Sequence, residues 1–145
     1  MPNPTIQTLS ISTQAVRQFV DITDSVQSVV TRSGVRDGMC FLFLPHTTAA
    51  LTLNENWDPE VPSDILHTLG TRTAPADPAH QHREGNSPAH VISSLIGAHL
   101  FLLVDSGKLL LGSWQGVFLV ECDGPRTRRV VVKILEDQAS GESAR

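Results

Sequence analysis

The chain has 145 residues, of which 40% are hydrophobic and 18% charged, so one domain with a sizeable core is expected over residues 1–145. A net charge of −4 is not typical of a nucleic-acid-binding protein. No apolar run approaches the roughly 20 residues of a membrane span, and residues 1–12 lack the pattern of a secretory signal. We therefore expect a cytoplasmic protein without nucleic-acid or membrane partners.

The first elements predicted along the chain are two strands and a helix. Residues 5–12 alternate loosely between apolar and polar side chains and predict a strand, and residues 15–20 predict a second. Three valines at helical spacing then predict a helix that has Thr23 as its N-cap and ends at Gly34.

The middle of the chain is predicted to contain two strands, a helix and a long loop. Residues 39–44 form a continuous apolar run, which is typical of a buried strand, and residues 49–53 predict another. A helix is expected to begin at Asp58-Pro59 and to end at Gly70. The polar and proline-rich residues 71–87 predict a loop, and loops of this length are often functional.

The last third is dominated by predicted strands. A short helix over residues 88–96 precedes them. The strand segments are residues 99–104, 108–111, 114–122 and 128–135. Because the turns are short, the strands are expected to pair antiparallel, and the whole pattern predicts an α+β fold with a core over about residues 5–136 and a polar tail at 137–145.

Polar side chains follow two of the predicted strands. His46 and Thr47 come after the strand at 39–44, and Asn54, Glu55 and Asp58 come at or after the end of the next. An imidazole at a strand end can ligate a metal, act as a general base or hold a phosphate oxygen, or it can simply bond to the backbone. Asp58 has a local explanation as a cap of the following helix, so Glu55 is the better acid–base candidate.

A second group of histidines lies in or beside the long loop. Three imidazoles with an open coordination position describe a catalytic or ligand-binding zinc site, although this spacing matches no short zinc signature. The candidate metal ligands are His46, His80, His82 and His90. Asn86 precedes the helix that carries His90, and the free N–H groups at the start of a helix attract anions.

The third polar group lies between residues 112 and 126. Trp114 can stack on an aromatic ligand or belong to the core or a subunit interface, and Gln115 lies next to it. Arg126 can bind a phosphate or carboxylate through two N–H groups, or it can pair with Asp123 to hold the turn. The residues alone leave these alternatives open.

Three segments resemble the YjbQ-like family, a group of small proteins also named the secondary thiamine-phosphate synthase family. The segments are PHTTAALTLNEN followed by Asp-Pro, GNSPAHVISSLIG, and GKLLLGSWQGVFLVECDGPRTRRV. The resemblance extends from about residue 5 to residue 135. The motif positions that it marks are His46, Thr47, Asn54, Glu55, Asn56, Asp58, His90, Trp114, Gln115, Asp123 and Arg126.

The resemblance implies an α+β domain built on an antiparallel, sandwich-like sheet with two to three helices, which assembles as a homotrimer. It also implies a weak ability to join a pyrimidine diphosphate to a thiazole phosphate and so form thiamine phosphate. Two positions depart from the family pattern. Ile92 stands where a lysine is frequent, and the loop histidine of the family corresponds to either His80 or His82.

Together these observations predict a trimeric enzyme that binds a small phosphorylated molecule or anion. His46, Glu55 and Arg126 are the predicted catalytic residues, and a divalent metal, zinc or magnesium, is the expected cofactor. The predicted ligand-binding residues are Thr47, Asn54, Asp58, Asn86, Trp114 and Gln115. The alternative is a trimeric module that binds a metal or anion without turnover.

Overall fold

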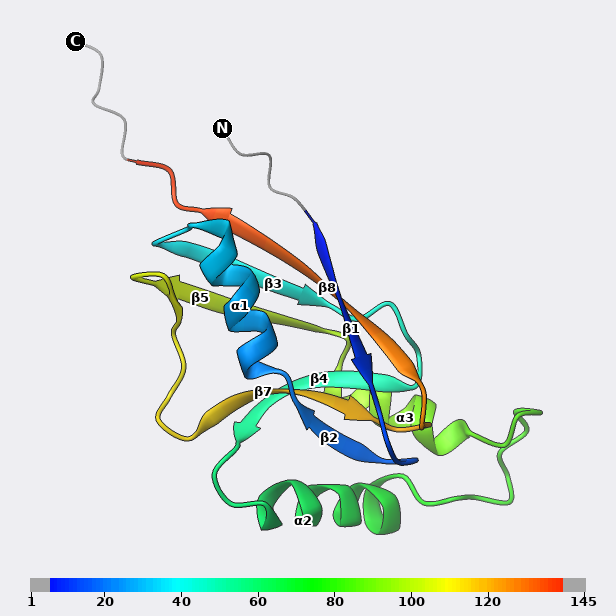
Figure 1. Cartoon of the computed structure of the whole chain (residues 1–145). Coiled ribbons are helices and arrows are strands. Elements are labelled where there is room, and N and C mark those ends of the chain that lie inside the picture. The colour runs from blue at the N-terminus through cyan, green and yellow to red at the C-terminus, as the bar shows by residue number, and fades with distance from the viewer. Residues whose placement is uncertain (1–5, 140–145) are drawn as a thin grey trace.

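The computed structural model describes residues 6–139, so Thr5 of the first predicted strand and residues 140–145 of the tail lie outside the described residues. Helices and strands are mixed along this part of the chain, which confirms the predicted α+β class (Figure 1). The strands are β1 (Gln7–Ser12), β2 (Gln18–Asp21), β3 (Gly38–Phe43), β4 (Ala49–Glu55), β5 (His99–Asp105), β6 (Lys108–Leu109), β7 (Gln115–Glu121) and β8 (Thr127–Glu136). The α-helices are α1 (Thr23–Ser33), α2 (Glu60–Thr68) and α3 (Ser87–Ile96), and a π-helical segment, η1 (Leu69–Thr73), follows α2.

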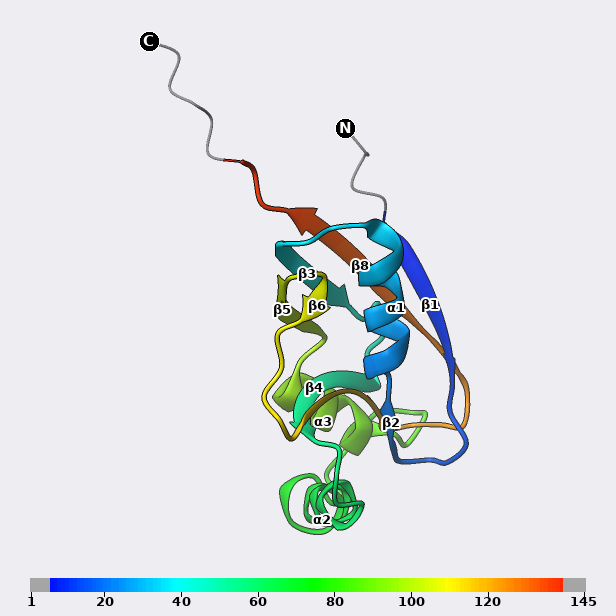
Figure 2. The same cartoon turned by 60° about the vertical axis from the view of Figure 1, so that its left-hand side comes forward.

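The strands form two sheets. The large sheet has the order β1-β8-β3-β5-β6, and the small sheet has the order β2-β7-β4. Each neighbouring pair of strands is antiparallel, which confirms the predicted pairing. Figures 1 and 2 show α1 against the large sheet, whereas α2 and α3 lie on the side of the small sheet away from it.

The main core lies where α1 meets both sheets. Its buried side chains include Val26, Val29 and Val30 of α1, Cys40 and Leu42 of β3, Val117 and Leu119 of β7, and Val130 and Val132 of β8. The helical spacing of the three valines therefore identified the buried face of α1 correctly. A smaller cluster packs α3 and η1 against the outer face of the small sheet, through Ala50, Ala74, Ala89, Ile92, Val120 and Cys122.

Two predicted helix boundaries are wrong. Thr23 is the first residue of α1 rather than its cap, and its hydroxyl instead accepts the N–H of Val117 at 2.9 Å. Gly70 does not end the second helix, because the chain continues through it as η1. Gly34 does end α1, in the left-handed conformation with φ +73°, which glycine adopts without steric cost.

The predicted buried strand at 39–44 is buried on one face only. Cys40, Leu42 and Leu44 point into the core, whereas Phe41 and Phe43 are 38% and 53% exposed. Phe41 lies opposite Phe101 of β5, and their ring centroids are 5.4 Å apart. The outer face of the large sheet therefore carries a patch of aromatic and aliphatic side chains, which we call the apolar sheet face: Phe41, Phe43, Phe101 and Leu103.

Candidate functional site at one end of the small sheet

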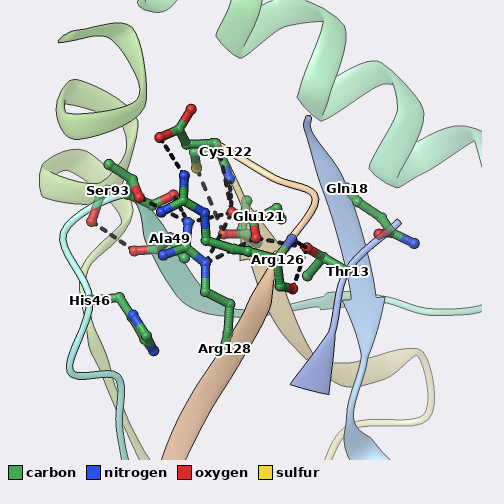
Figure 3. Close-up of polar contacts among 12 residues, drawn as sticks. Thr13, Gln18, His46, Ala49, Ser93, Glu121, Cys122, Arg126 and Arg128 are labelled. Carbon is green, nitrogen blue, oxygen red and sulfur yellow. Dashed lines mark hydrogen bonds and ion pairs between the residues drawn. The ribbon is translucent and has the colours of Figure 1, made fainter. Parts of the chain in front are cut away.

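A buried ion pair joins the end of β7 to the start of β8. Glu121 and Arg128 are 0% and 2% exposed. Arg128 Nη2 lies 2.6 Å from Glu121 Oε2, and Arg128 Nε donates to Oε1 at 2.9 Å (Figure 3). The guanidinium thus engages both carboxylate oxygens, which is the geometry that makes such pairs strong.

The remaining polar atoms of this pair are bonded to the surrounding segments. Thr13 Oγ1 donates to Glu121 Oε1 at 2.8 Å, and the backbone N–H groups of Cys122 and Asp123 donate to Oε2. Arg128 Nη2 also donates to the carbonyl and the hydroxyl of Thr48, at 3.0 and 2.9 Å. The network therefore ties the segment after β1 and the start of β4 to the β7–β8 connection.

The charge state of the pair follows from these bonds. Burial alone would raise the pKa of Glu121, but the hydrogen bonds from Arg128, the Asp123 N–H and Thr13 outweigh burial and hold the pKa below its ordinary value. Glu121 is therefore ionised at neutral pH. Because Arg128 is buried and already neutralised, it is not available to bind a ligand anion.

His46 lies beside this network and accepts a hydrogen bond. The backbone N–H of Arg129 donates to His46 Nε2 at 2.9 Å. Burial, followed by the charges of Arg128 and Arg129, lowers the pKa of His46. The imidazole is therefore neutral at pH 7 with its proton on Nδ1, and it can offer a ligand an N–H donor rather than a free base.

Arg126 and Asn86 meet at the same carboxylate. Asp123 Oδ2 accepts from Arg126 Nη2 at 3.0 Å and from Asn86 Nδ2 at 2.9 Å. The ion pair with Asp123, one of the two alternatives for Arg126, is thus formed. The Arg126 side chain is still 49% exposed, and within residues 6–139 its guanidinium makes no second side-chain bond, so donors remain for a ligand.

The start of α3 offers the N–H of Ser87 to this end of the small sheet, because Pro88 has no N–H and those of Ala89 and His90 donate to Asn86 O. No side chain caps the helix, and Asn86 directly precedes it. Asn86 Oδ1 is buried and has no hydrogen-bond partner among the described residues. His90 of the first turn packs edge-to-face on His82 of the long loop, with ring centroids 5.2 Å apart. Of the two loop histidines, His82 is thus the one beside His90.

The predicted four-histidine metal site does not form within one chain. Residues 6–139 contain no group of three or more His, Cys, Asp or Glu side chains placed to hold a metal ion. His82 and His90 are together, but His46 uses Nε2 for the Arg129 N–H and His80 is exposed on the loop. The described residues of a single chain therefore do not fit zinc or magnesium, and we derive no chemistry through a metal.

The first polar block is divided between the two ends of the small sheet. Ala49 pairs with Glu121, whereas Glu55 pairs with Gln115 at the other end of β4 and β7. At roughly 3.3 Å per residue, the two ends of β4 are about 20 Å apart. Glu55 therefore does not reach His46 and Arg126 within one chain, and neither do Asn54, Asp58, Trp114 and Gln115.

The side chains at that other end have local contacts. Asp58 Oδ1 accepts the N–H of Glu60 at 2.9 Å at the start of α2, as the capping alternative predicted. Gln115 Oε1 accepts the N–H of Gly112 at 2.8 Å, and Asn54 Oδ1 accepts that of Glu55. Trp114 is 56% exposed and packs edge-to-face on Trp57, so it does not belong to the core of the single chain.

The chain matches a known protein family over most of its length. Residues 7–137 match the family model described as UPF0047 protein YjbQ-like. The chain belongs to the UPF0047 YjbQ-like family. The resemblance seen in the sequence motifs is thereby confirmed.

Relatives and a solved structure of this family align over most of their length. A UPF0047 protein of Methanocaldococcus jannaschii is 44% identical over 128 residues, covering 88% of this chain and 92% of the relative. The UPF0047 protein YugU of Bacillus subtilis is 38% identical, with 90% and 98% covered. A crystal structure of an uncharacterised YjbQ/UPF0047 protein from Clostridium acetobutylicum is 47% identical and superimposes with a TM-score of 0.86, covering 89% of this chain and 99% of the other.

The buried half of the site in this UPF0047 protein was not predicted from the sequence. Thr48 and Glu121 were marked only as groups that could bind or react, and Thr13 and Arg128 received no role. The four residues nevertheless hold the turn that carries Arg126. One signal was present. Glu121 directly follows the apolar residues 117–120, and a carboxylate in such a strand needs a buried partner.

Proposed function

We propose that this UPF0047 protein binds the phosphate groups of a small phosphorylated molecule at the end of the small sheet. We further propose that it slowly joins a pyrimidine diphosphate to a thiazole phosphate to form thiamine phosphate. The observation that carries the proposal is the meeting of Arg126 and the start of α3 through the shared carboxylate of Asp123. The family resemblance in the sequence supports the choice of reaction.

The chemistry of this reaction suits a site that supplies donors rather than a base. The thiazole ring nitrogen gives its lone pair to the benzyl-like carbon of the pyrimidine, and the C–O bond breaks with its electrons leaving on pyrophosphate. No proton has to be removed, because the nitrogen becomes a thiazolium cation. The free N–H groups of Arg126, the Nδ1–H of His46 and the N–H of Ser87 at the start of α3 can stabilise the leaving pyrophosphate.

The same geometry argues for a slow reaction. Of the arginines at this end, Arg128 is fully committed to Glu121 and Arg126 is partly neutralised by Asp123. These two arginines therefore offer little charge to the leaving group. This observation also supports a second candidate, a module that binds a phosphorylated molecule or another anion without turnover.

Alanine substitutions at His46 and Arg126 test the proposal. We expect His46→Ala and Arg126→Ala each to reduce the rate of thiamine phosphate formation about ten- to hundred-fold, because each removes a bond worth about 1.5–3 kcal/mol to a developing charge. A purified assay, backed by complementation of a thiamine-requiring bacterial strain, measures the rate.

The matched control is Arg36→Ala, which removes an exposed arginine near the end of α1 that points away from this site. Its rate should equal that of the wild type. Unchanged rates in both His46→Ala and Arg126→Ala would show that any activity arises elsewhere. That result, together with retained binding of inorganic phosphate, would favour the non-catalytic module.

We also propose that the chain assembles as a homotrimer through the apolar sheet face. Phe43 and Phe101 are each 53% exposed and Leu103 is 45% exposed, and such a contiguous patch is typical of a protein–protein interface. Association would also give the residues at the other end of β4, Glu55 and Trp114 among them, a route to the site of a neighbouring subunit.

Light scattering coupled to size exclusion tests the assembly. The wild type should have three times the 15.7 kDa mass of one chain. We expect Phe101→Lys to give a monomer, because it places a charge within the interface. Leu95→Lys, which changes an exposed apolar residue outside the apolar sheet face, should leave the trimer intact. A wild-type monomer at all concentrations would contradict the proposal.

A cytoplasmic location is part of the same proposal. Cys40 and Cys122 are both free and buried. Burial raises the pKa of Cys40 to about 11 and that of Cys122 to about 12, so both thiols are unreactive at neutral pH. Buried free thiols of this kind fit a reducing compartment.

A further inference from the structure

The side chain of Arg17 lies in a notch of the helical layer. Arg17 is half-buried in the segment that leads into β2. A Cβ atom added at Gly70 would lie 2.0 Å from Arg17 Nη1 and 3.3 Å from Cζ. The guanidinium therefore occupies the space that a side chain at position 70 would fill, and glycine at this position is what allows it to pack there.

The backbone around this notch is unusual. Gly70 belongs to η1, the π-helical segment that continues α2. π-Helical segments are rare in proteins, and those that occur often lie at functional sites. A glycine inside a helix also destabilises the helix by about 1 kcal/mol relative to alanine. The notch thus combines two locally unfavourable features, and the missing side chain of Gly70 leaves the space that the Arg17 guanidinium fills.

Arg17 has no protein partner in the part of the chain that the structure describes. Arg126 pairs with Asp123 and Arg128 pairs with Glu121, but within residues 6–139 no carboxylate, carbonyl or hydroxyl accepts a bond from the Arg17 side chain. A half-buried guanidinium has lost part of its hydration, so it gains from an anion that completes its hydrogen bonds.

This cation lies at the same end of the small sheet as the proposed phosphate site. Val16 O accepts the N–H of Gly124 at 3.0 Å, and Gln18 pairs with Glu121, so Arg17 lies beside Cys122 and the turn that carries Arg126. Burial raises the pKa of Cys122, and the positive charge of Arg17 partly offsets this rise, which is consistent with a guanidinium near that thiol. In Figure 1 the start of β2, the end of β7 and the start of α3 meet at this end.

We infer that Arg17 binds the terminal phosphoryl group of a diphosphate ligand whose first phosphoryl group lies at Arg126 and the start of α3. The inference rests on the proposed function and deepens it, because it assigns a residue to the terminal phosphoryl group of the diphosphate. Gly70 positions Arg17 for this contact, since any larger residue would displace the guanidinium from the notch.

Calorimetric binding of inorganic pyrophosphate and of inorganic phosphate tests the inference. We expect Arg17→Met to weaken pyrophosphate binding about ten- to hundred-fold and to change phosphate binding less than about threefold, because only pyrophosphate reaches Arg17. Gly70→Ala keeps the charge but closes the notch, and should weaken pyrophosphate binding to a similar extent. The double variant should be no worse than either single variant, since both changes remove one contact.

Arg36→Met is the control, because it deletes an exposed arginine away from this site, and it should bind both anions as the wild type does. If Arg17→Met binds pyrophosphate like the wild type while Arg126→Ala is impaired, the role of Arg17 is overturned and the proposed function stands. If the wild type binds neither anion, both are overturned. An equal loss for phosphate and pyrophosphate in Arg17→Met would overturn the assignment to the terminal group.

Discussion

Replacement of Glu121 by glutamine should lower the free energy of unfolding by about 3–5 kcal/mol, the cost typical of removing one partner from a buried ion pair. The substitution keeps the size of the side chain but leaves the Arg128 charge, 2% exposed, without a counter-ion. Urea denaturation at pH 7, followed by circular dichroism, measures the change. A loss below about 1 kcal/mol would show that the pair behaves as a surface pair.

The exposed ion pair in the next turn is the matched control. Asp123→Asn removes the carboxylate that pairs with Arg126, whose side chain is 49% exposed. Surface pairs contribute at most about 1 kcal/mol, so this variant should be much more stable than Glu121→Gln. Both substitutions replace a carboxylate by the corresponding amide, and the two positions are close in the sequence. The difference between their free energies of unfolding therefore reports the effect of burial.

The contribution of Glu121 to the stability of the fold should be lost at acidic pH. The pKa of Glu121 in the fold lies below its ordinary value of 4.5, so the carboxylate binds a proton less readily in the folded than in the unfolded chain. Its stabilising contribution is therefore present above pH 4.5 and is lost as the pH falls from there through the folded pKa. Glu121→Gln should flatten this part of the stability profile.

Ile92→Lys should lower the free energy of unfolding by about 4 kcal/mol. A lysine at this buried position would either have to lose its proton or keep an ammonium charge away from water, and both cost free energy. If the lysine that is frequent here in the family holds phosphate, the resemblance predicts that Ile92→Lys raises activity or tightens phosphate binding. The burial of Ile92 leads us to the opposite expectation, because its side chain is 1% exposed and packs in the smaller cluster with Ala89 and Val120. Urea denaturation of the variant measures the effect.

The neighbouring position on the same helix supplies the control. Val91 is 38% exposed, so Val91→Lys should change the stability by no more than about 0.5 kcal/mol. An Ile92→Lys protein as stable as the wild type, with tighter binding of inorganic phosphate, would show instead that this face of α3 is open to the ligand.

Local patterns in the sequence determined most of the strands, the buried face of α1 and the antiparallel pairing. Val26, Val29 and Val30 identified that face because helical spacing depends only on neighbouring residues. The motifs also identified the family, since they are contiguous segments. The second helix was predicted to end at Gly70, because glycine often ends a helix. The structure instead continues through Gly70 as η1, with Arg17 packed against that glycine, a contact between residues far apart in the sequence.

Only the tertiary structure decided which polar residues meet. The motif that contains His46 and Glu55 reads as one block, but β4 lies between them and carries them to opposite ends of the small sheet. Conversely, Thr13, Thr48, Glu121 and Arg128 are distributed over the chain and are brought together by strand pairing. The apolar residues 39–44 show the same limit. Their apolar composition correctly predicted a strand. Whether a strand is buried on both faces depends on what packs against each face, and no described element covers the outer face of the large sheet. Phe41 and Phe43 are therefore exposed.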